Sequence, residues 1–206
     1  MATFKPKLPL FRHHKKKVYA GVSSTAHFIH QVGENQTLRK KSKSVPVNKI
    51  TSKSFQQKIA YMKKRMREYR KRTGMGRGIT GVQLGIPERF SVIYTPDKKL
   101  MIIINPKITK RSKKLLRFPE VCMSANPIIA PVVRPSWVEF DYYDEKRKRQ
   151  KWNVKDTTKA GKIMNRVFQH EIDHMEGIIC IDKVSSRDLI LESDPKFYKN
   201  AKFQEV

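Results

Sequence analysis

The segment Phe168–His174, with the sequence FQHEIDH, carries the clearest chemical pattern in this chain. It lies within residues 157–176, which we predict to form a helix. Residues four apart on a helix share one face, so His170 and His174 can direct ring nitrogens at a single metal ion. Glu171 follows the first histidine, where it can reach a metal-bound water rather than the metal. The alternative interpretation is two surface histidines on a polar helical turn.

A third protein ligand is expected, because a catalytic metal site usually has three protein ligands and one position left for water. Cys122, within Pro119–Ser124, is the candidate, since a thiolate binds transition metals well. Its other interpretation is a buried core cysteine, which is a common environment for this residue. We favour that interpretation for Cys180, which lies in the apolar segment 178–181 with no polar partner nearby in the sequence.

Elsewhere the sequence predicts a mixture of helix and strand, which is typical of the α+β class. A first helix over residues 54–72 is indicated by one apolar face, formed by Phe55, Ile59, Met62, Met66 and Tyr69. We expect Gly74 to end this helix and Gly177 to end the second. Strands are predicted at Phe90–Tyr94, Met101–Asn105, Ile128–Val133, Val138–Tyr142 and Ile178–Ile181, with a basic turn over Glu145–Lys151.

The charge balance is strongly positive. The chain of 206 residues has 45 Lys and Arg against 18 Asp and Glu, a formal net charge of +27. A free soluble enzyme gains nothing from that much self-repulsion, so the composition favours a polyanionic partner, most often nucleic acid. An anionic membrane surface and a simply solubilising surface are the alternatives.

Residues 1–26 form a basic extension in which no acidic residue occurs, the first being Glu34. Such a start resembles an organelle transit peptide, and it equally resembles the arm of a ribosomal protein that binds RNA. No apolar run approaches the length of a membrane-spanning helix. Two cysteines far apart do not form a disulfide scaffold, which indicates a reducing compartment.

Three segments resemble, in order, the three motifs of the peptide deformylase family. Gln169–His174 is similar to the third motif, QHExDH, and Glu120–Ser124 is similar to the second, EGCLS. Gly76–Gln83 is similar to the first, GxGxAAPQ, and residues 85–87 extend it in register. The resemblance covers roughly residues 29–187. An unrelated H-E-x-x-H protease would leave the other two motifs without a role.

The resemblance implies removal of the formyl group from the N-terminal methionine of nascent polypeptides. It implies one divalent metal ion held by Cys122, His170 and His174, with Fe²⁺ expected and Zn²⁺ or Ni²⁺ as alternatives. Glu171 would take a proton from the metal's water and return it to the leaving amine.

The same resemblance assigns the developing oxyanion to the metal, the side-chain amide of Gln83 and the backbone N–H of Met123. Gln83 could equally be an ordinary polar loop residue. We interpret Gln169 and Asp173 as structural residues near the metal rather than as ligands.

The chain departs from the family pattern at several positions. Val121 replaces the glycine of the second motif, which adds bulk beside Cys122 and restricts the backbone. Thr80–Val82 replaces Ala-Ala-Pro in the first motif, and Arg77 places a charge where the family prefers an apolar residue. None of these changes removes an implied ligand, the base or the oxyanion glutamine, but they can alter substrate entry.

We therefore expect an α+β, deformylase-like fold in which antiparallel sheets surround a central metal-binding helix, with the first helix on the outside. The expected organisation is a basic extension over residues 1–26, a deformylase-like domain over 27–187 and a polar tail over 188–206.

Two functional hypotheses follow. The first is a deformylase held near the ribosome and ribosomal RNA by its positive charge. The second is a deformylase-like structural component of the mitochondrial large ribosomal subunit with reduced or no activity. The basic N-terminus and the family resemblance favour a mitochondrial location, with another organelle or the cytoplasm as alternatives.

Overall fold

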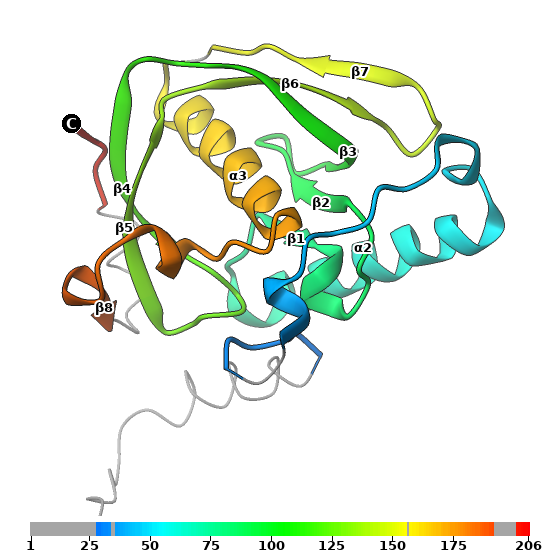
Figure 1. The fold of residues 1–206 in the computed structure, drawn as a ribbon, viewed down its shortest axis with the longest axis horizontal. Helices are drawn as coiled ribbons and strands as arrows, with labels where there is room; N and C mark the ends of the chain where they lie inside the picture. Colours follow the sequence, from blue (N-terminus) through cyan, green and yellow to red (C-terminus); the bar gives the residue numbers. More distant parts are fainter. Residues whose placement is uncertain (1–27, 34–35, 156, 192–200) are drawn as a thin grey trace, which may run out of the picture.

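The computed structural model describes residues 28–33, 36–155, 157–191 and 201–206 (Figure 1). The predicted extension over residues 1–26 lies outside the described residues, as do residues 192–200 of the predicted tail. Within the described residues, the α-helices are α2 (Lys53–Thr73) and α3 (Lys159–Met175). The strands are β1 (Gly78–Thr80), β2 (Phe90–Tyr94), β3 (Leu100–Arg111), β4 (Leu115–Val121), β5 (Ile128–Pro135), β6 (Val138–Tyr143), β7 (Arg149–Trp152), β8 (Ile190–Leu191) and β9 (Gln204–Glu205).

The strands form two sheets in which every named pair is antiparallel. One sheet has the order β1-β2-β3-β6-β7 and the other β8-β5-β4-β9. Helix α3 runs through the middle of the molecule, with both sheets around it, and α2 lies at the periphery (Figure 1). The predicted α+β architecture, with antiparallel sheets around a central helix, is thus confirmed.

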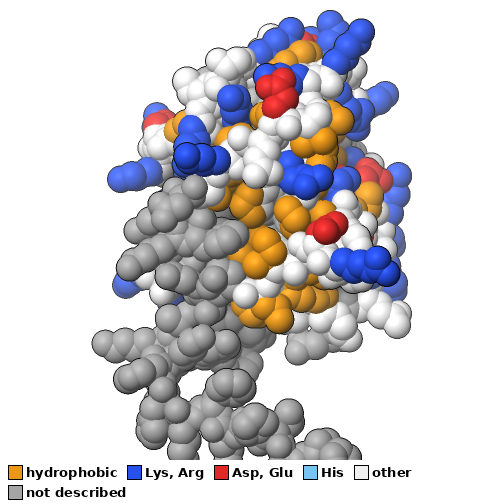
Figure 2. All heavy atoms as spheres, turned by 90° about the vertical axis from the view of Figure 1, so that its left-hand side faces the viewer, with side chains coloured by type: hydrophobic (Ala, Val, Ile, Leu, Met, Phe, Trp, Pro, Cys, Tyr) orange, Lys and Arg blue, Asp and Glu red, His pale blue; other side chains and the backbone are white. Residues whose placement is uncertain are grey.

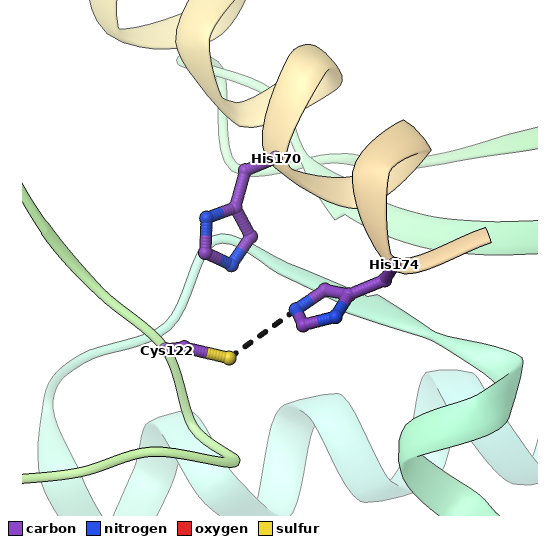
Figure 3. A group of neighbouring side chains, drawn as sticks. All are labelled: Cys122, His170 and His174. Atoms are coloured by element: carbon purple, nitrogen blue, oxygen red, sulfur yellow. Dashed lines mark hydrogen bonds between the residues drawn. The ribbon is translucent and has the colours of Figure 1, made fainter. Parts of the chain in front are cut away.

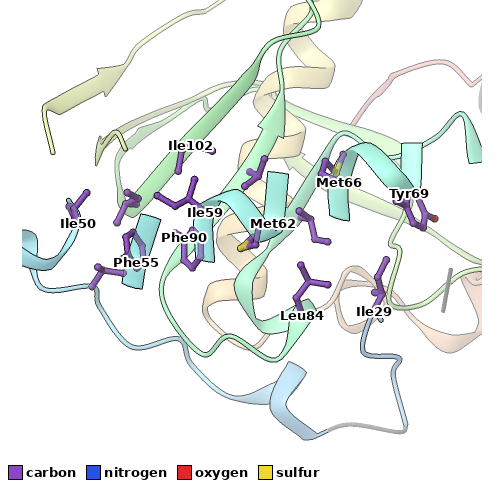
Figure 4. Close-up of a cluster of buried hydrophobic side chains, with 14 residues drawn as sticks. Ile29, Ile50, Phe55, Ile59, Met62, Met66, Tyr69, Leu84, Phe90 and Ile102 are labelled. Atoms are coloured by element: carbon purple, nitrogen blue, oxygen red, sulfur yellow. The ribbon is translucent and has the colours of Figure 1, made fainter. Parts of the chain in front are cut away.

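Helix α2 covers one face of the five-stranded sheet. The five residues of its predicted apolar face are all buried, and they pack with Phe90, Val92, Ile102 and Ile104 of β2 and β3 (Figure 4). The intervening residues Ile93 and Ile103 point to the opposite face and pack against α3. The alternation within β2 and β3 therefore places the two helices on opposite faces of this sheet.

The ends of both helices follow from local chemistry. The Ser52 side chain accepts a hydrogen bond from the N–H of Phe55 at the start of α2, and Gly74 ends it at a φ of 68°. The Thr158 side chain caps α3 in the same way. Gly177, at a φ of 77°, follows its C-terminus, and a Cβ there would lie 2.4 Å from the Arg39 carbonyl oxygen. The predicted helix ends at Gly74 and Gly177 are confirmed.

The segment Ile178–Ile181 is not a strand, and that prediction was wrong. Residues Cys180–Lys183 form a 3₁₀ turn instead. The carboxylate of Asp182 accepts a hydrogen bond from the N–H of Ile179 at 2.7 Å. This local bond satisfies a backbone donor that a strand would have paired with a neighbour.

Five strands of the described residues, β1, β4, β7, β8 and β9, were also missed. The expected basic turn ends early, because Arg149–Trp152 forms β7 and pairs with β6. The predicted tail contributes β8, and residues 201–206 contribute β9 on the free edge of β4. Strand β4 itself was not predicted, since its charged residues and Pro119 interrupt the apolar alternation.

The outer surface on the side of β4, β5 and β8 is basic around an apolar centre. Lys and Arg side chains surround an area of hydrophobic side chains there (Figure 2). Leu115 of β4 and Ile190 and Leu191 of β8 are exposed hydrophobic residues of these elements. Among the described residues, no helix is long and apolar enough to span a membrane.

Candidate metal centre

The structure brings the three expected ligands together. Cys122 directly follows β4, and His170 and His174 lie one turn apart on α3 (Figure 3). One potential ligand atom from each of the three lies within 4.8 Å of the other two. The Cys122 Sγ is 3.2 Å from Nε2 of His174. Zinc–ligand distances of about 2.0–2.3 Å place ligand atoms about 3–4 Å apart. The Cys122–His174 separation lies in this range. The 4.8 Å limit of the whole group is larger, so the three side chains would close slightly around one transition-metal ion.

The hydrogen bonding of the two rings also fits a metal. Nδ1 of His170 lies 3.0 Å from Oε2 of Glu120, which leaves Nε2 for an ion. His174 is fully buried, its Nε2 faces only the thiol of Cys122, and its Nδ1 has no partner among the described residues. An imidazole buried with so few partners is costly, and a bond from Nε2 to a metal offsets part of that cost.

The electrostatics of the three residues depend on the ion. Burial and the charge of His170 lower the pKa of His174 well below its usual value, which keeps this ring in the neutral form that binds metals. Burial alone would lower the pKa of His170, but the hydrogen bond and charge of Glu120 raise it to about 9. The neighbouring Cys180 thiol and burial raise the pKa of Cys122 well above the usual value. A cation between these groups is what would hold Cys122 as a thiolate.

A buried ionic network around Glu120 holds the Nδ1 side of the His170 ring. The Glu120 carboxylate accepts hydrogen bonds from Nε and Nη2 of Arg134 at 2.6 and 2.9 Å, and from Arg166 at 2.5 Å. Arg134 also binds Asp173 at 2.6 Å. Sequence reasoning had assigned no role to Glu120, Arg134 or Arg166. The sequence did contain a signal for this network. Glu120 lies two residues before Cys122 in an extended segment, and Arg166 lies four residues before His170 on a helix. Each of these spacings places the two side chains on the same face of their element.

Replacing Glu120 with Gln is expected to destabilise the metal-free protein by about 3–5 kcal/mol at neutral pH, because two buried guanidinium groups lose their shared anion. Burial would raise the pKa of Glu120, but Arg134 and His170 hold it well below the usual 4.5. A depressed carboxylate pKa stabilises the fold above about 4.5, and this contribution is lost as pH falls through the folded-state value.

Urea unfolding of both proteins across pH checks this prediction. The difference between them should be largest near neutrality and shrink under acid conditions. A matched change in a partly exposed pair, Glu68→Gln beside Arg65, should have little effect. A Glu120→Gln protein as stable as the parent at neutral pH would contradict the network.

Glu171 lies in a closely packed position beside β1. It is buried, and its Oε2 accepts a hydrogen bond from the Thr80 hydroxyl at 2.6 Å. A Cβ on Gly78 would lie 2.3 Å from Oε1, so only glycine fits that position of β1 without moving Glu171. Burial raises the pKa of Glu171, although its interactions with His170 and Thr80 oppose that change. A raised pKa is suited to a group that exchanges protons near neutral pH.

Thr80 is a further residue that sequence reasoning missed. The resemblance marked it only as a departure from alanine, yet its hydroxyl contacts both Glu171 and Ser91, each at 2.6 Å. Replacing Thr80 with Val keeps the shape and removes the hydroxyl. We expect a loss of about 1–3 kcal/mol in the free energy of unfolding, because a buried carboxylate loses a donor. Thr80→Ser should retain most of the stability, and equal losses in both variants would mean that packing, not the hydrogen bond, is responsible.

Gln83 and Met123 both lie next to Cys122. Gln83 is buried, and its Nε2 donates to the Ser124 hydroxyl at 3.1 Å and lies 3.7 Å from the Cys122 Sγ. Its Oε1 accepts the Thr80 N–H at 2.9 Å, which fixes the turn Gly81–Leu84. Met123 follows Cys122 in the chain and is partly buried. An amide donor and a backbone segment are therefore held against the thiol.

The departures from the family pattern fit the fold. Val121 is paired with Ile129 at the end of β4, and by alternation its side chain faces away from Glu120 and Cys122. Its bulk is therefore directed away from the thiol, and its expected effect on substrate entry stays a prediction. A Cβ on Gly81 would lie 2.6 Å from the Ile86 carbonyl oxygen, so this glycine permits a close approach. Arg77 is exposed, and its carbonyl accepts the Tyr94 N–H.

Asp173, Gln169 and Cys180 lie near the metal centre but are not part of its group of three candidate ligands. Asp173 binds Arg134 and Lys183, at 2.6 and 3.3 Å. Gln169 donates to the carbonyl oxygens of Pro135 and Asn165. Cys180 is a buried free thiol in the same apolar cluster as Cys122.

Two antiparallel sheets around a helix with an H-E-x-x-H turn, completed by a cysteine that directly follows strand β4, form an α+β protein with a candidate metal site of the kind found in metallohydrolases. The family model for polypeptide deformylase matches residues 27–189. The chain therefore belongs to the polypeptide deformylase family.

Individual relatives agree with this assignment. The peptide deformylase of Picosynechococcus is 34% identical over 128 residues, which are 60% of this chain and 65% of that protein. The chain thus matches slightly less than two thirds of that relative's length. The peptide deformylase of Rhizobium meliloti is 31% identical over 133 residues, 62% of this chain and 71% of that protein.

Solved structures show the same fold. The peptide deformylase of Thermotoga maritima has a TM-score of 0.66 at 27% identity, over 76% of this chain and 96% of its own. The peptide deformylase of Synechococcus elongatus, solved in complex with actinonin, has a TM-score of 0.63 at 28% identity, over 77% of this chain and 79% of its own.

Proposed function

We propose that this chain is a metal-dependent deformylase, which hydrolyses the formyl amide at the N-terminal methionine of nascent polypeptides. The observation that carries the proposal is the grouping of Cys122, His170 and His174 within 4.8 Å, with Glu171 next to the first histidine. When bound, a divalent metal supplies Lewis-acid activation of water and of the formyl oxygen. Fe²⁺ is the proposed ion, with Zn²⁺ or Ni²⁺ as alternatives.

Residues of the protein supply proton transfer and stabilisation of the oxyanion. Glu171 takes the proton of the attacking water and delivers it to the amine as the C–N bond breaks, so that formate and a free N-terminus leave. Gln83 Nε2 and the N–H of Met123 donate hydrogen bonds to the oxygen on which negative charge develops. The Thr80 hydroxyl orients Glu171 by donating to its Oε2, and the absence of a side chain at Gly78 leaves room for its Oε1.

A formate-release assay tests the activity. The chain is purified without oxygen, loaded separately with Fe²⁺, Zn²⁺ or Ni²⁺, and given formyl-Met or acetyl-Met peptides. We expect turnover of the formyl peptide only, since the larger acetyl group adds bulk at the reacting carbon. A folded, metal-loaded protein that releases no formate from any formyl-Met peptide would refute the proposal.

A second candidate function is favoured by the net charge of +27. It is a deformylase-like structural component of the mitochondrial large ribosomal subunit, with reduced or no catalysis. Our proposal for both candidates includes a ribosomal RNA partner and a mitochondrial location, with another organelle or the cytoplasm as alternatives. Sedimentation of organelle lysate at low and high salt separates them, because a built-in component should resist moderate salt while an attracted enzyme should be released.

A further inference from the structure

Helix α2 presents an outward face that carries positive charge and no carboxylate. Residues on this face follow one another at spacings of three and four, and all are exposed; we call it the outer face of α2, formed by Lys53, Gln57, Ala60, Lys64, Arg67 and Lys71. The last three span about 10 Å of helix axis. Among the described residues, none of these three cations lies within ion-pair distance of a carboxylate.

Three neighbouring cations of α2 are paired with carboxylates, in contrast. Lys58 binds Glu88 at 2.7 Å, Lys63 binds Glu145 at 2.5 Å and Arg65 binds Glu68 at 2.8 Å. These pairs lie on the flanks of the helix, between the buried face and the outer face. The fold therefore pairs these three cations internally and leaves Lys64, Arg67 and Lys71 for an external anion.

The outer face is also rigidly held. The opposite face of α2 is anchored by five buried apolar side chains, including Met62 and Met66, which are completely buried. A cation on a fixed helix loses less conformational entropy on binding than one on a flexible segment. The helix cannot turn its apolar face to a lipid bilayer, because that face is already packed in the core (Figure 4). These features favour a nucleic-acid backbone over a membrane surface.

We propose that the outer face of α2 is an RNA-docking surface, on which Lys64, Arg67 and Lys71 each contact a phosphate. The proposal deepens the ribosomal partnership of the proposed function and rests on it for the biological RNA. Because α2 and α3 lie on opposite faces of the five-stranded sheet, RNA on α2 leaves the face that carries α3 uncovered (Figure 1).

The test compares two variants of equal net charge. One is Lys64→Gln/Arg67→Gln/Lys71→Gln. The control is Lys107→Gln/Arg111→Gln/Lys113→Gln, which removes three exposed cations from β3 and the turn after it. Binding of a fluorescent RNA duplex of about 20 base pairs is measured by anisotropy at several KCl concentrations. Thermal unfolding verifies that both variants fold.

We expect the α2 variant to bind at least about tenfold more weakly than the control, with a salt-dependence slope lower by about 3. Equal weakening in both variants, or none in the α2 variant, would overturn the proposal. Vesicles of phosphatidylserine and phosphatidylcholine are tested in parallel, and an α2-dependent loss of binding to vesicles but not to RNA would also overturn it. Formate release from short formyl-Met peptides should be unchanged in both variants, so this test is independent of the enzymatic proposal.

Discussion

Glu171→Gln is expected to lower kcat/KM for a formyl-Met peptide by about 10²–10⁴-fold, with one metal ion per chain retained. The amide has the size of the carboxylate and can still accept the hydrogen bond from Thr80, so the fold is preserved. It cannot accept a proton from water or deliver one to the leaving amine. The loss should therefore appear mainly in kcat rather than in KM.

A matched control lies near the end of the same helix. Glu176 is partly exposed, and it binds Lys41 and Arg89 rather than any residue of the metal centre. Glu176→Gln removes the same charge and should leave kcat within about twofold of the parent. Rates that fall equally in the two variants would point to an effect of charge or stability, and a Glu171→Gln protein of normal activity would exclude this residue as the base.

The second large effect is expected for Cys122→Ser. A serine hydroxyl is a far poorer ligand than a thiolate, so the variant should lose metal to a chelator that the parent resists. The fall in affinity should exceed the roughly 10–100-fold that follows loss of an outer hydrogen-bond partner. Competition with a chromophoric chelator gives the affinity directly.

Cys180→Ser is the natural control for this change. Cys180 is buried in the same apolar cluster as Cys122 but is not part of the three-residue group. It should retain one tightly bound ion per chain. Loss of metal from Cys180→Ser, or its retention in Cys122→Ser, would show that the sulfur ligand has been assigned to the wrong cysteine.

Local patterns in the sequence were sufficient to predict the helices. Spacings of three and four placed Phe55 and Tyr69 on the buried face of α2, and the same geometry placed His170 and His174 together on α3. These predictions succeeded because a helix brings together residues that are close in sequence. The third ligand, Cys122, is 52 residues from His174; ligand chemistry made it a candidate beside the alternative of a core cysteine, and the family resemblance favoured it as the ligand.

The parts that sequence reasoning missed depend on contacts between distant segments. Strand β4 is held by pairing with β5 and β9. Pro119 and the charged residues of this strand interrupt the alternation of apolar residues by which a strand is predicted. The segment at Cys180 is apolar enough for a strand but turns, because Asp182 satisfies the backbone locally. Thr80 acquires its contact with Glu171 only when β1 packs beside α3, 91 residues further along the chain.

The most direct test of the central claim is X-ray absorption spectroscopy at the edge of the bound metal, on protein loaded with one equivalent of Zn²⁺. A site formed by Cys122, His170 and His174 predicts one sulfur ligand at about 2.3 Å and two imidazole nitrogens at about 2.0–2.1 Å. A metal bound without sulfur, or with two sulfur ligands, would contradict it.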